Sequence, residues 1–436
     1  MYSRKDIERY IDFVKNGEGY EEDYLHLKEE CKKRKYFYHG KPLPFAYQPL
    51  LVSDKDDETF NYITKMTYSI VSKVTNRYVK DEDYRKLFNY SKFEEKMILH
   101  VPLCKTDVPM ARFDIFYESE DNFKFCEINT DGSSAMIEDL NISTLLMESK
   151  IFNDLAWNFR SYELFDSWVN YFIENYYKDT EKELKTVLIA DFNEAGTQNE
   201  FVEFQKHFEK MGIKCIIEDI RELKYNKNEN ALYSNGVQID AVYRRVVMSD
   251  LREHLEDSSD FVDAYLNDAA YFVGPFRSQV VHNKVFFAIL HMDETKEFLT
   301  DEENDFINKH IPYTIRFEGD EEFFNNIVKH KDKYIFKPCN LNASRGVYLG
   351  REYSTEEFII KAREDFNKDY IVQEFVERKT IPFLKLINGK WSIIDLGNMI
   401  GLFSYFGKFS GIYARMGEDD IIKTTGGYIT APAIRY

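Results

Sequence analysis

Apolar residues recur every three or four positions in the first hundred residues, which is the spacing of amphipathic helices. The pattern is clear over residues 5–14, 57–75 and 84–100. Prolines at positions 42, 44 and 49 fall between the first two stretches and indicate a long connection there. The pattern predicts a mostly helical region over residues 1–109.

The pattern changes to a period of two over residues 110–129, which is typical of β-strands with one buried face. Helical spacing returns over residues 143–176, and the charged stretch at 177–185 indicates a boundary. Residues 110–180 are therefore expected to form a β-hairpin followed by helices.

Short apolar runs alternate with an amphipathic helix in the next part of the chain. Residues 186–191, 214–220 and 238–243 predict strands, and residues 199–211 predict the helix. Strands that alternate with helices imply a parallel sheet, which we expect within residues 181–275.

The last part of the chain, residues 276–436, mixes both kinds of element. The predicted strands lie at residues 334–337 and 370–374, and the predicted helices lie at residues 321–330 and 355–367. The fold class expected from all four parts is α/β (α+β).

Composition and charge exclude several classes of protein. Aromatic residues make up 16% of the 436 residues, which disfavours a disordered chain. The formal net charge of −18 disfavours a large nucleic-acid or anionic membrane interface, because phosphate groups are neutralised by clustered Lys and Arg. No apolar run reaches the ~18 residues of a membrane span, and the charged N-terminus lacks the apolar core of a signal peptide. A cytoplasmic protein that binds neither membrane nor nucleic acid is expected.

The five cysteines are spread along the chain and never form a C-x-x-C pair. This usage fits reduced thiols rather than a disulfide framework or a zinc site.

Polar residues line one face of the predicted hairpin. A four-residue turn at 119–122 would pair Glu118 with Phe123, so that Asp114 faces Glu127 and Arg112 faces Asn129. Directly paired residues and residues two apart share a face. Arg112, Asp114, Glu127 and Asn129 are therefore expected on one side of the hairpin.

Two facing carboxylates repel each other unless a cation or a proton lies between them. Carboxylate and amide oxygens are hard ligands that suit Mg²⁺, so Asp114, Glu127 and Asn129 are candidate metal ligands. Arg112 beside them is suited to hold a phosphate in a bidentate fork. The alternative is a solvated sheet face with ordinary surface charges.

The segments Arg112-Phe-Asp114 and Glu127-Ile-Asn129-Thr-Asp-Gly-Ser-Ser, followed by Glu138, resemble the synthetase part of glutathionylspermidine synthase and its relatives. The resemblance implies a circularly permuted ATP-grasp fold, with the α/β unit as a pre-ATP-grasp-like domain. It also implies that Asp114, Glu127 and Asn129 hold Mg²⁺ and that Arg112 assists at the transferred phosphoryl group. The residues after Asn129 depart from the family pattern A-D-T-P-T, so the substrate pocket near this loop is expected to differ.

Further segments resemble the ATP-binding elements of this family, in the order that the permutation requires. They are His282-Asn-Lys284, Ile335-Phe-Lys337-Pro, Asn342-Ala-Ser-Arg345-Gly346-Val, Ile371-Val-Gln373-Glu374-Phe, Gly411-Ile-Tyr-Ala-Arg415 and Ile421-Ile-Lys-Thr. The resemblance implies that ATP is bound by residues from four of these segments, namely Lys284, Lys337, Arg345, Gly346, Gln373 and Glu374. Lysines from separate strands suit phosphates as point charges.

Each segment taken alone has an ordinary interpretation. Lys284 is a common kind of surface lysine, Glu374 is a common kind of strand-end carboxylate, and Arg345 is equally well a solvated loop residue. Possible contacts with substrate or phosphate are Ser133, Ser134, Arg245 and Arg415, and Arg245 is equally well a strand-end residue paired with acidic neighbours.

We therefore expect an ADP-forming ligase that uses ATP and Mg²⁺ to join a carboxylate to an amine through an acylphosphate. The carboxylate partner is a small molecule or a peptide, and nothing in the sequence sets the oligomeric state. The alternative is a nucleotide-binding protein of this fold with weak or no turnover and a regulatory or scaffold role. The residues 276–436 would form the nucleotide-binding lobes, and residues 110–180 would contribute the metal site.

Overall fold

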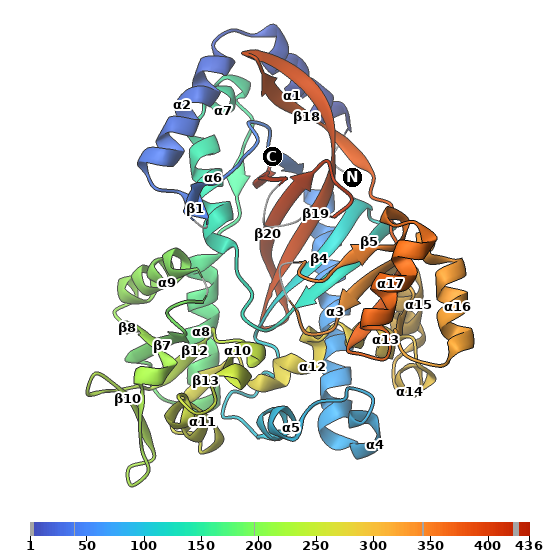
Figure 1. The fold of residues 1–436 in the computed structure, drawn as a ribbon. Coiled ribbons are helices and arrows are strands. Elements are labelled where there is room, and N and C mark those ends of the chain that lie inside the picture. The colour runs from blue at the N-terminus through green and yellow to red at the C-terminus, as the bar shows by residue number, and fades with distance from the viewer. Residues whose placement is uncertain (1–3, 39, 196, 342–343, 422–426) are drawn as a thin grey trace.

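A six-stranded antiparallel sheet forms the centre of the molecule (Figure 1). The computed structural model describes residues 4–38, 40–195, 197–341, 344–421 and 427–436. The strand order is β21-β20-β19-β4-β5, and β18 extends the sheet along β19. The strands are β4 (Met110–Ser119), β5 (Asn122–Asn129), β18 (Thr380–Ile387), β19 (Lys390–Tyr405), β20 (Lys408–Gly417) and β21 (Tyr428–Thr430).

The hairpin of β4 and β5 has the predicted register at its functional end: Asp114 pairs with Glu127 and Arg112 pairs with Asn129. The predicted four-residue turn is wrong, because Ser119 pairs with Asn122 across a two-residue turn. The register shifts between Tyr117 and Ser119, and shifts back between Asp114 and Ile115. The first bulge adds one residue to β4 and the second adds one residue to β5, so the two shifts in register cancel. The pairing at the polar end is therefore the one expected.

The long helix α3 (Asp54–Lys80) packs against β19 and β20 and covers one face of the central sheet (Figure 1). It begins at a capping box in which Ser53 and Asp56 satisfy each other's backbone amides. The other N-terminal elements are α1 (Arg4–Asn16), α2 (Tyr20–Lys33), β1 (Phe37–Tyr38), β2 (Lys41–Pro42) and β3 (Leu50–Val52). Strand β3 pairs with the last strand of the chain, β22 (Ala433–Arg435), which also pairs with β6 (Arg160–Ser161).

Two expected long helices are interrupted. Residues 84–100 form α4 (Glu82–Arg85) and α5 (Lys92–Leu99), because the side chain of Ser91 caps a new helix start. Residues 143–176 form parts of α6 (Met136–Met147), α7 (Lys150–Leu155) and α8 (Phe165–Thr180). A left-handed Ala156 (φ 50°) ends α7, and the Glu163 carboxylate accepts the first amides of α8.

The predicted parallel sheet is confirmed. Its order is β13-β12-β7-β8, and every neighbouring pair runs parallel. The strands are β7 (Thr186–Asp191), β8 (Lys214–Asp219), β12 (Ala241–Arg244) and β13 (Tyr271–Val273), accompanied by α9 (Gln198–Lys210), α10 (Met248–Glu253), α11 (Ser259–Leu266) and a small sheet of β9 (Lys224–Asn226), β10 (Ala231–Ser234) and β11 (Val237–Gln238). Helices α8 and α9 bury Trp168 and Phe204 against this unit.

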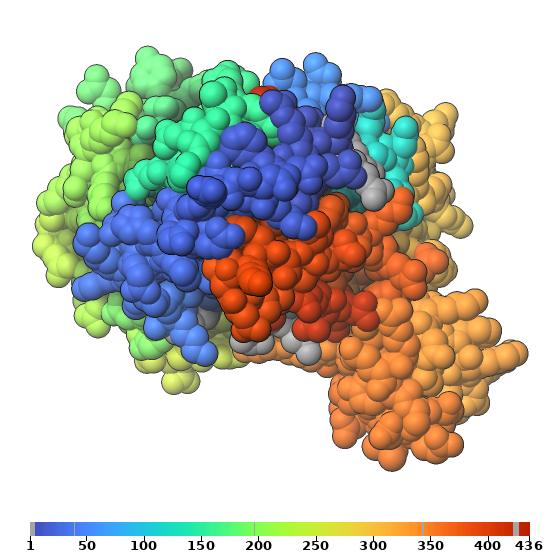
Figure 2. All heavy atoms as spheres, turned by 90° about the horizontal axis from the view of Figure 1, so that it is seen from above, coloured from blue at the N-terminus to red at the C-terminus, as the bar shows by residue number. Residues whose placement is uncertain are grey.

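A second antiparallel sheet, of order β14-β17-β15-β16, forms a lobe that projects from the body of the molecule (Figure 2, orange). Its strands are β14 (Thr314–Arg316), β15 (Tyr334–Pro338), β16 (Tyr348–Leu349) and β17 (Tyr370–Glu374). The helices of this part of the chain are α12 (Gln279–His282), α13 (Val285–Leu290), α14 (Asp293–Lys296), α15 (Asp301–His310), α16 (Glu321–Lys329) and α17 (Thr355–Asp365).

All five cysteines are free thiols, as expected. Among the described residues, no helix has both the length and the apolar character that crossing a membrane requires.

Candidate functional site

Two cavities meet at the polar end of the β4–β5 hairpin. The inter-sheet cavity lies between the central and four-stranded sheets and has apolar walls, which include Phe125, Ile335, Val347 and Met399. The loop cavity is bordered by residues 131–135, by α10 and by the end of β7. Glu127, Ser344 and Arg415 line both cavities, so they mark the place where the two meet.

Asp114 is fully buried and is held by cations of the protein itself. Arg112 donates from Nε to Asp114 Oδ1 (2.7 Å) and from Nη2 to Oδ2 (2.9 Å). Asn129 Nδ2 donates to Asp114 Oδ2 (3.2 Å). Gly401 lies opposite Asp114 on β19, and a Cβ there would approach Arg112 Cδ to 2.7 Å, so only glycine leaves room for this pair.

Glu127, which faces Asp114 across the hairpin, has a different partner. Lys284 Nζ lies 2.7 Å from Glu127 Oε1 and also donates to the carbonyl of Leu341 (2.9 Å). Burial by itself would raise the pKa of Glu127, but the ammonium of Lys284, with further contributions from His282 and Lys337, lowers it to about 2. Glu127 is therefore charged at neutral pH. The two facing carboxylates are stabilised separately, by Arg112 and by Lys284.

Lys337 is the second buried lysine of the inter-sheet cavity. Its Nζ donates to Gln373 Oε1 (2.7 Å) and to the carbonyl of Cys126 (3.1 Å). Gln373 in turn donates to Thr314 (2.9 Å), which fixes the position of the lysine. The ordinary interpretation of Lys284 as a surface lysine is wrong, because both lysines are only 7% exposed.

Arg415 is the charged group with the fewest partners at the junction of the cavities. It is 7% exposed, and its Nε has no hydrogen-bond partner in the described structure. Its Nη2 lies 3.7 Å from Asp114 Oδ2 and 3.8 Å from Met399 Sδ, both of which are weak contacts. A buried guanidinium with unused donors favours an anionic ligand.

The oxygen atoms at the junction fit a divalent metal ion. Among the described residues, neither Glu127 Oε2 nor the side-chain oxygen of Asn129 takes part in a hydrogen bond or ion pair, and both residues line the loop cavity. Asp114 accepts three hydrogen bonds, which leaves part of its acceptor capacity. The set of two carboxylates and an amide is the donor chemistry that Mg²⁺ prefers.

Two buried arginines fix the loop at residues 131–135. Arg244 is the last residue of β12, and Arg245 follows it directly. Arg244 binds Asp131, and Arg245 donates to the carbonyls of Ser133 and Gly132. The Ser134 carbonyl accepts from Arg112 Nη1 (2.6 Å). Arg245 is thus a strand-end residue paired with an acidic neighbour, Glu200 (3.1 Å), which is the ordinary interpretation of this residue. It also lines the loop cavity, together with Ser133 and Ser134.

Acidic side chains also line the loop cavity, and we call these residues its acidic wall. Asp191 ends β7, at the edge where ligands of parallel sheets commonly bind, and Asp250 lies nearby on α10. Burial raises the pKa of Asp191 to about 7, and Asp250 adds to this effect. Glu138 accepts a hydrogen bond from Tyr413, and burial raises its pKa. This wall is suited to a cationic or protonatable group.

The remaining predicted residues are less closely tied to the cavities. Glu374 is exposed at the end of β17 and lines the inter-sheet cavity. Arg345 and Gly346 are exposed in the loop before β16, where Arg345 influences Asp250 electrostatically. The preceding Asn342 and Ala343 lie outside the described residues, as do residues 422–424 of the last predicted segment.

The sequence did not predict several residues of the site, among them Asp191, Gly401, Asp250 and Tyr413. Gly401 and Asp250 reach it only through tertiary contacts, and no local signal marks them. Tyr413 lies two residues before Arg415 on β20, so strand periodicity places both on one face and offered a signal.

Comparisons with known proteins agree with this architecture. The family model described as "Glutathionylspermidine synthase preATP-grasp" matches residues 46–430. A glutathione synthetase-like effector from Globodera pallida, in its apo form, has a TM-score of 0.60 and 12% identity over 94% of this chain and 96% of its own. The comparison with curated proteins gave no match.

Two other solved structures are similar to a smaller degree. A putative γ-glutamylcysteine synthetase from Methylobacillus flagellatus has a TM-score of 0.46 and 10% identity, over 83% of this chain and 86% of its own. D-alanyl-alanine synthetase A from Vibrio cholerae has a TM-score of 0.31 and 11% identity, over 57% of this chain and 87% of its own. The family match, together with the shared fold of the effector, confirms the predicted permuted ATP-grasp fold of mixed α/β class.

Proposed function

The chain belongs to the glutathionylspermidine synthase preATP-grasp family, and on that premise we propose that it is an ATP-dependent ligase that joins a carboxylate to an amine. The observation that carries the proposal is the meeting of the two cavities at Glu127 and Arg415, beside two buried lysines. An apolar cavity with buried cations at one end suits a nucleotide, whose base is apolar and whose phosphates are anionic.

ATP would bind in the inter-sheet cavity, with its base between the apolar walls and its phosphates at Lys284 and Lys337. Gln373 positions Lys337 through its hydrogen bond. Glu374 is suited to the ribose at the outer end, and Arg345 and Gly346 are suited to approach the phosphates from the loop. The site would use Mg²⁺ held by Asp114, Glu127 and Asn129, which would offset negative charge on the phosphates.

The donor carboxylate would lie in the loop cavity, near Ser133, Ser134 and Arg415. One of its oxygens attacks the γ-phosphorus of ATP, the bond to the β-phosphate oxygen breaks, and ADP leaves. Arg112 and Arg415 stabilise the charge that spreads over the transferring group. The product of this step is an acylphosphate.

The amine would then attack the acyl carbon, and inorganic phosphate would leave with the electrons of the broken C–O bond. The attacking nitrogen loses one proton in this step. Asp191 is suited to accept that proton, because its pKa of about 7 lies near neutral pH. The acidic wall would also attract the amine in its protonated form.

The experiment is ADP release with a panel of carboxylates and amines that includes glutathione, amino acids, short peptides, spermidine and putrescine. Glu127→Gln is expected to abolish release while the protein stays folded, because a metal ligand and the partner of Lys284 are both lost. Glu120→Gln, an exposed change at the turn of the same hairpin, is the matched control. Full activity of Glu127→Gln would remove this residue from the site.

Arg112→Lys in the same assay separates catalysis from structure. The lysine keeps the charge but loses the planar fork that holds Asp114, so a fall in single-turnover rate of about 10²-fold is expected with little change in ATP affinity. A loss of rate that only follows a lower melting temperature would make Arg112 a structural partner of Asp114.

The second candidate is an ATP-binding protein without turnover. The observation in its favour is that Asp114 already has a bidentate arginine partner and an amide partner. ATP binding without ADP release for any pair in the panel would support this candidate.

A further inference from the structure

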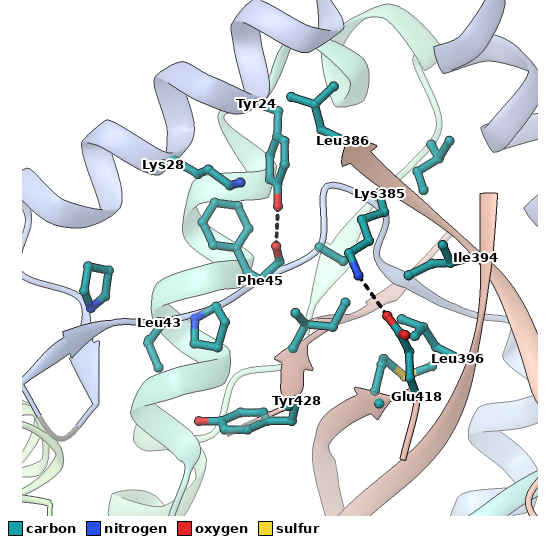
Figure 3. A pocket seen from close by; sticks show the side chains of 18 of the residues that line it. Tyr24, Lys28, Leu43, Phe45, Lys385, Leu386, Ile394, Leu396, Glu418 and Tyr428 are labelled. Carbon is teal, nitrogen blue, oxygen red and sulfur yellow. Dashed lines mark hydrogen bonds and ion pairs between the residues drawn. The ribbon is translucent and has the colours of Figure 1, made fainter. Parts of the chain in front are cut away.

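A groove separate from the two cavities runs between α2 and the hairpin of β18 and β19 (Figure 3). We call it the α2 groove. One wall is formed by Tyr24 and Lys28 of α2 and by Leu43 and Phe45 of the following connection. The residues of this wall precede residue 46, where the family match begins. These residues of the wall therefore lie outside the region that the family model matches.

The α2 groove lies next to the loop cavity of the proposed reaction site. Tyr428 lines both the groove and the loop cavity, and Figure 3 shows it at one end of the groove. The same residue packs against Met399, which lines the inter-sheet cavity. A long molecule with its reacting end in the loop cavity can thus extend past Tyr428 into the groove.

The far side of the groove offers an open strand edge. Strand β19 pairs with β18 along residues 390–397, but β20 ends at Gly417, opposite Gly397. Along residues 390–396, the edge of β19 that faces away from β18 therefore has no strand partner in the part of the chain that the structure describes. The groove is lined there by Ile394 and Leu396 of β19 and by Met416 at the end of β20. Backbone groups on a free edge are satisfied by an added extended peptide, whereas an acyl chain leaves them unpaired.

The groove is lined by three lysines and by the carboxylates of Glu418 and Asp419, and one of the lysines is suited to bind an anionic group of a ligand. Lys385 is paired with Glu418 (2.8 Å), and Lys32 is paired with Glu29 (2.6 Å). Lys28 has no carboxylate partner among the described residues, and its Nζ lies 4.3 Å from the centre of the Tyr24 ring. Burial and the neighbouring Lys32 lower its pKa. A carboxylate bound beside the ammonium would oppose both effects, because an opposite charge nearby favours the charged form of the lysine.

We propose that the α2 groove binds an extended peptide segment of a substrate, with an apolar side chain against Ile394 and Leu396 and a carboxylate at Lys28. This inference rests on the proposed function, since the peptide would be the distal part of the carboxylate or amine substrate. It makes the substrate a peptide several residues long rather than a free amino acid or a simple polyamine.

The test is affinity selection from a library of hexapeptides with free termini, in the presence of a non-hydrolysable ATP analogue and Mg²⁺. The wild-type protein is expected to enrich peptides that carry an apolar residue and an acidic group. Lys28→Glu is expected to weaken an enriched peptide by about tenfold or more, as the loss of a charge-assisted contact implies. Amidating the peptide's acidic group should weaken binding to wild type but not further weaken binding to Lys28→Glu.

Two matched controls share the helix and the strand. Lys33→Glu makes the same charge change on α2 outside the groove, and Ile393→Glu places a charge beside Ile394 on a residue that does not line it. Both are expected to bind as wild type, while Ile394→Glu loses the apolar preference. No enrichment, or enriched peptides that bind the groove variants and the controls equally, would overturn the proposal. Binding of palmitate with the same variant sensitivity, and of no peptide, would overturn it in favour of an acyl chain.

ATP affinity and ADP release are measured on the same preparations. Peptide binding that depends on Lys28 and Ile394 without any ADP release would keep the groove and overturn the ligase. ADP release from short substrates, with no effect of the groove variants and no peptide enrichment, would keep the ligase and overturn the groove.

Discussion

Asp139 is a buried carboxyl group on α6 that takes no part in the proposed site. It is 1% exposed, and neither of its oxygens has a hydrogen-bond partner within the described residues. Burial raises its pKa to about 8, the nearby backbone amide of Ala433 partly offsets this rise, and the charge of Glu138 adds a smaller increase. The group is therefore mostly protonated in the folded protein at neutral pH, whereas the unfolded chain has lost this proton.

This difference gives stability a definite pH dependence. Between the ordinary carboxyl pKa and about 8, the folded state binds the extra proton, so the free energy of unfolding falls as pH rises. The contribution is about 1.4 kcal/mol per pH unit and ends above the folded-state pKa. Asp139→Asn removes it, so the variant's advantage over wild type is expected to grow from pH 5 to pH 7.5 in urea unfolding. Asp12→Asn on the surface is the control, and parallel pH profiles for Asp139→Asn and wild type would contradict the assignment.

At the scale of elements, α6 is capped by another helix. Its N-cap residue, Ala135, has a left-handed backbone and offers no side-chain cap. Glu200 of α9 instead accepts hydrogen bonds from the amides of Ala135 (3.0 Å), Met136 (2.9 Å) and Ile137 (3.3 Å). Its other oxygen binds Arg245 (3.1 Å), which holds the loop of Ser133. One carboxylate thus fixes a helix start and the edge of the loop cavity together.

Glu200→Gln is expected to lower the free energy of unfolding by about 3–5 kcal/mol, because Arg245 would keep a buried charge without its partner. The Michaelis constant of the substrate in the loop cavity should rise as well, since the loop loses its support. Urea unfolding and steady-state kinetics measure the two effects. Glu203→Gln, one turn along the same helix and partly exposed, should change stability by less than about 1 kcal/mol. If both substitutions change stability equally, the ion pair of Glu200 and Arg245 contributes no more than an ordinary surface ion pair.

At the scale of the whole molecule, the inter-sheet cavity joins the projecting lobe to the body. Phe125 and Met399 come from the central sheet, and Ile335 and Lys337 come from the four-stranded sheet. A nucleotide bound there would contact both units and stabilise the folded state as a whole.

ATP with Mg²⁺ at about 100 times its Kd is expected to add about 2.7 kcal/mol to stability. Lys337→Ala should weaken ATP binding by one to two decades, about 1.5–3 kcal/mol, and reduce this gain at the same ATP concentration. Lys333→Ala, an exposed lysine just before β15, is the control. Thermal unfolding with and without ATP measures both. The proposed phosphate contact would be refuted by an undiminished gain in Lys337→Ala.

The sequence by itself determined the features that depend on neighbouring residues. Alternation of polar and apolar positions, with a short polar turn, set the register that pairs Asp114 with Glu127, and two cancelling bulges left it unchanged. Runs of apolar residues separated by a helical pattern set the parallel sheet. These predictions succeeded because a strand or a hairpin is specified by periodicity within about 20 residues.

Only the tertiary structure decided which groups are charged, paired or exposed at the site. Lys284 meets Glu127 across 157 residues of chain, Glu200 caps a helix more than 60 residues away, and Gly401 opens space for Arg112 from a distant strand. The α2 groove likewise joins α2 to strands near the end of the chain. Local periodicity does not predict such contacts, because they form only when separate elements pack around one core and exclude water from the groups between them.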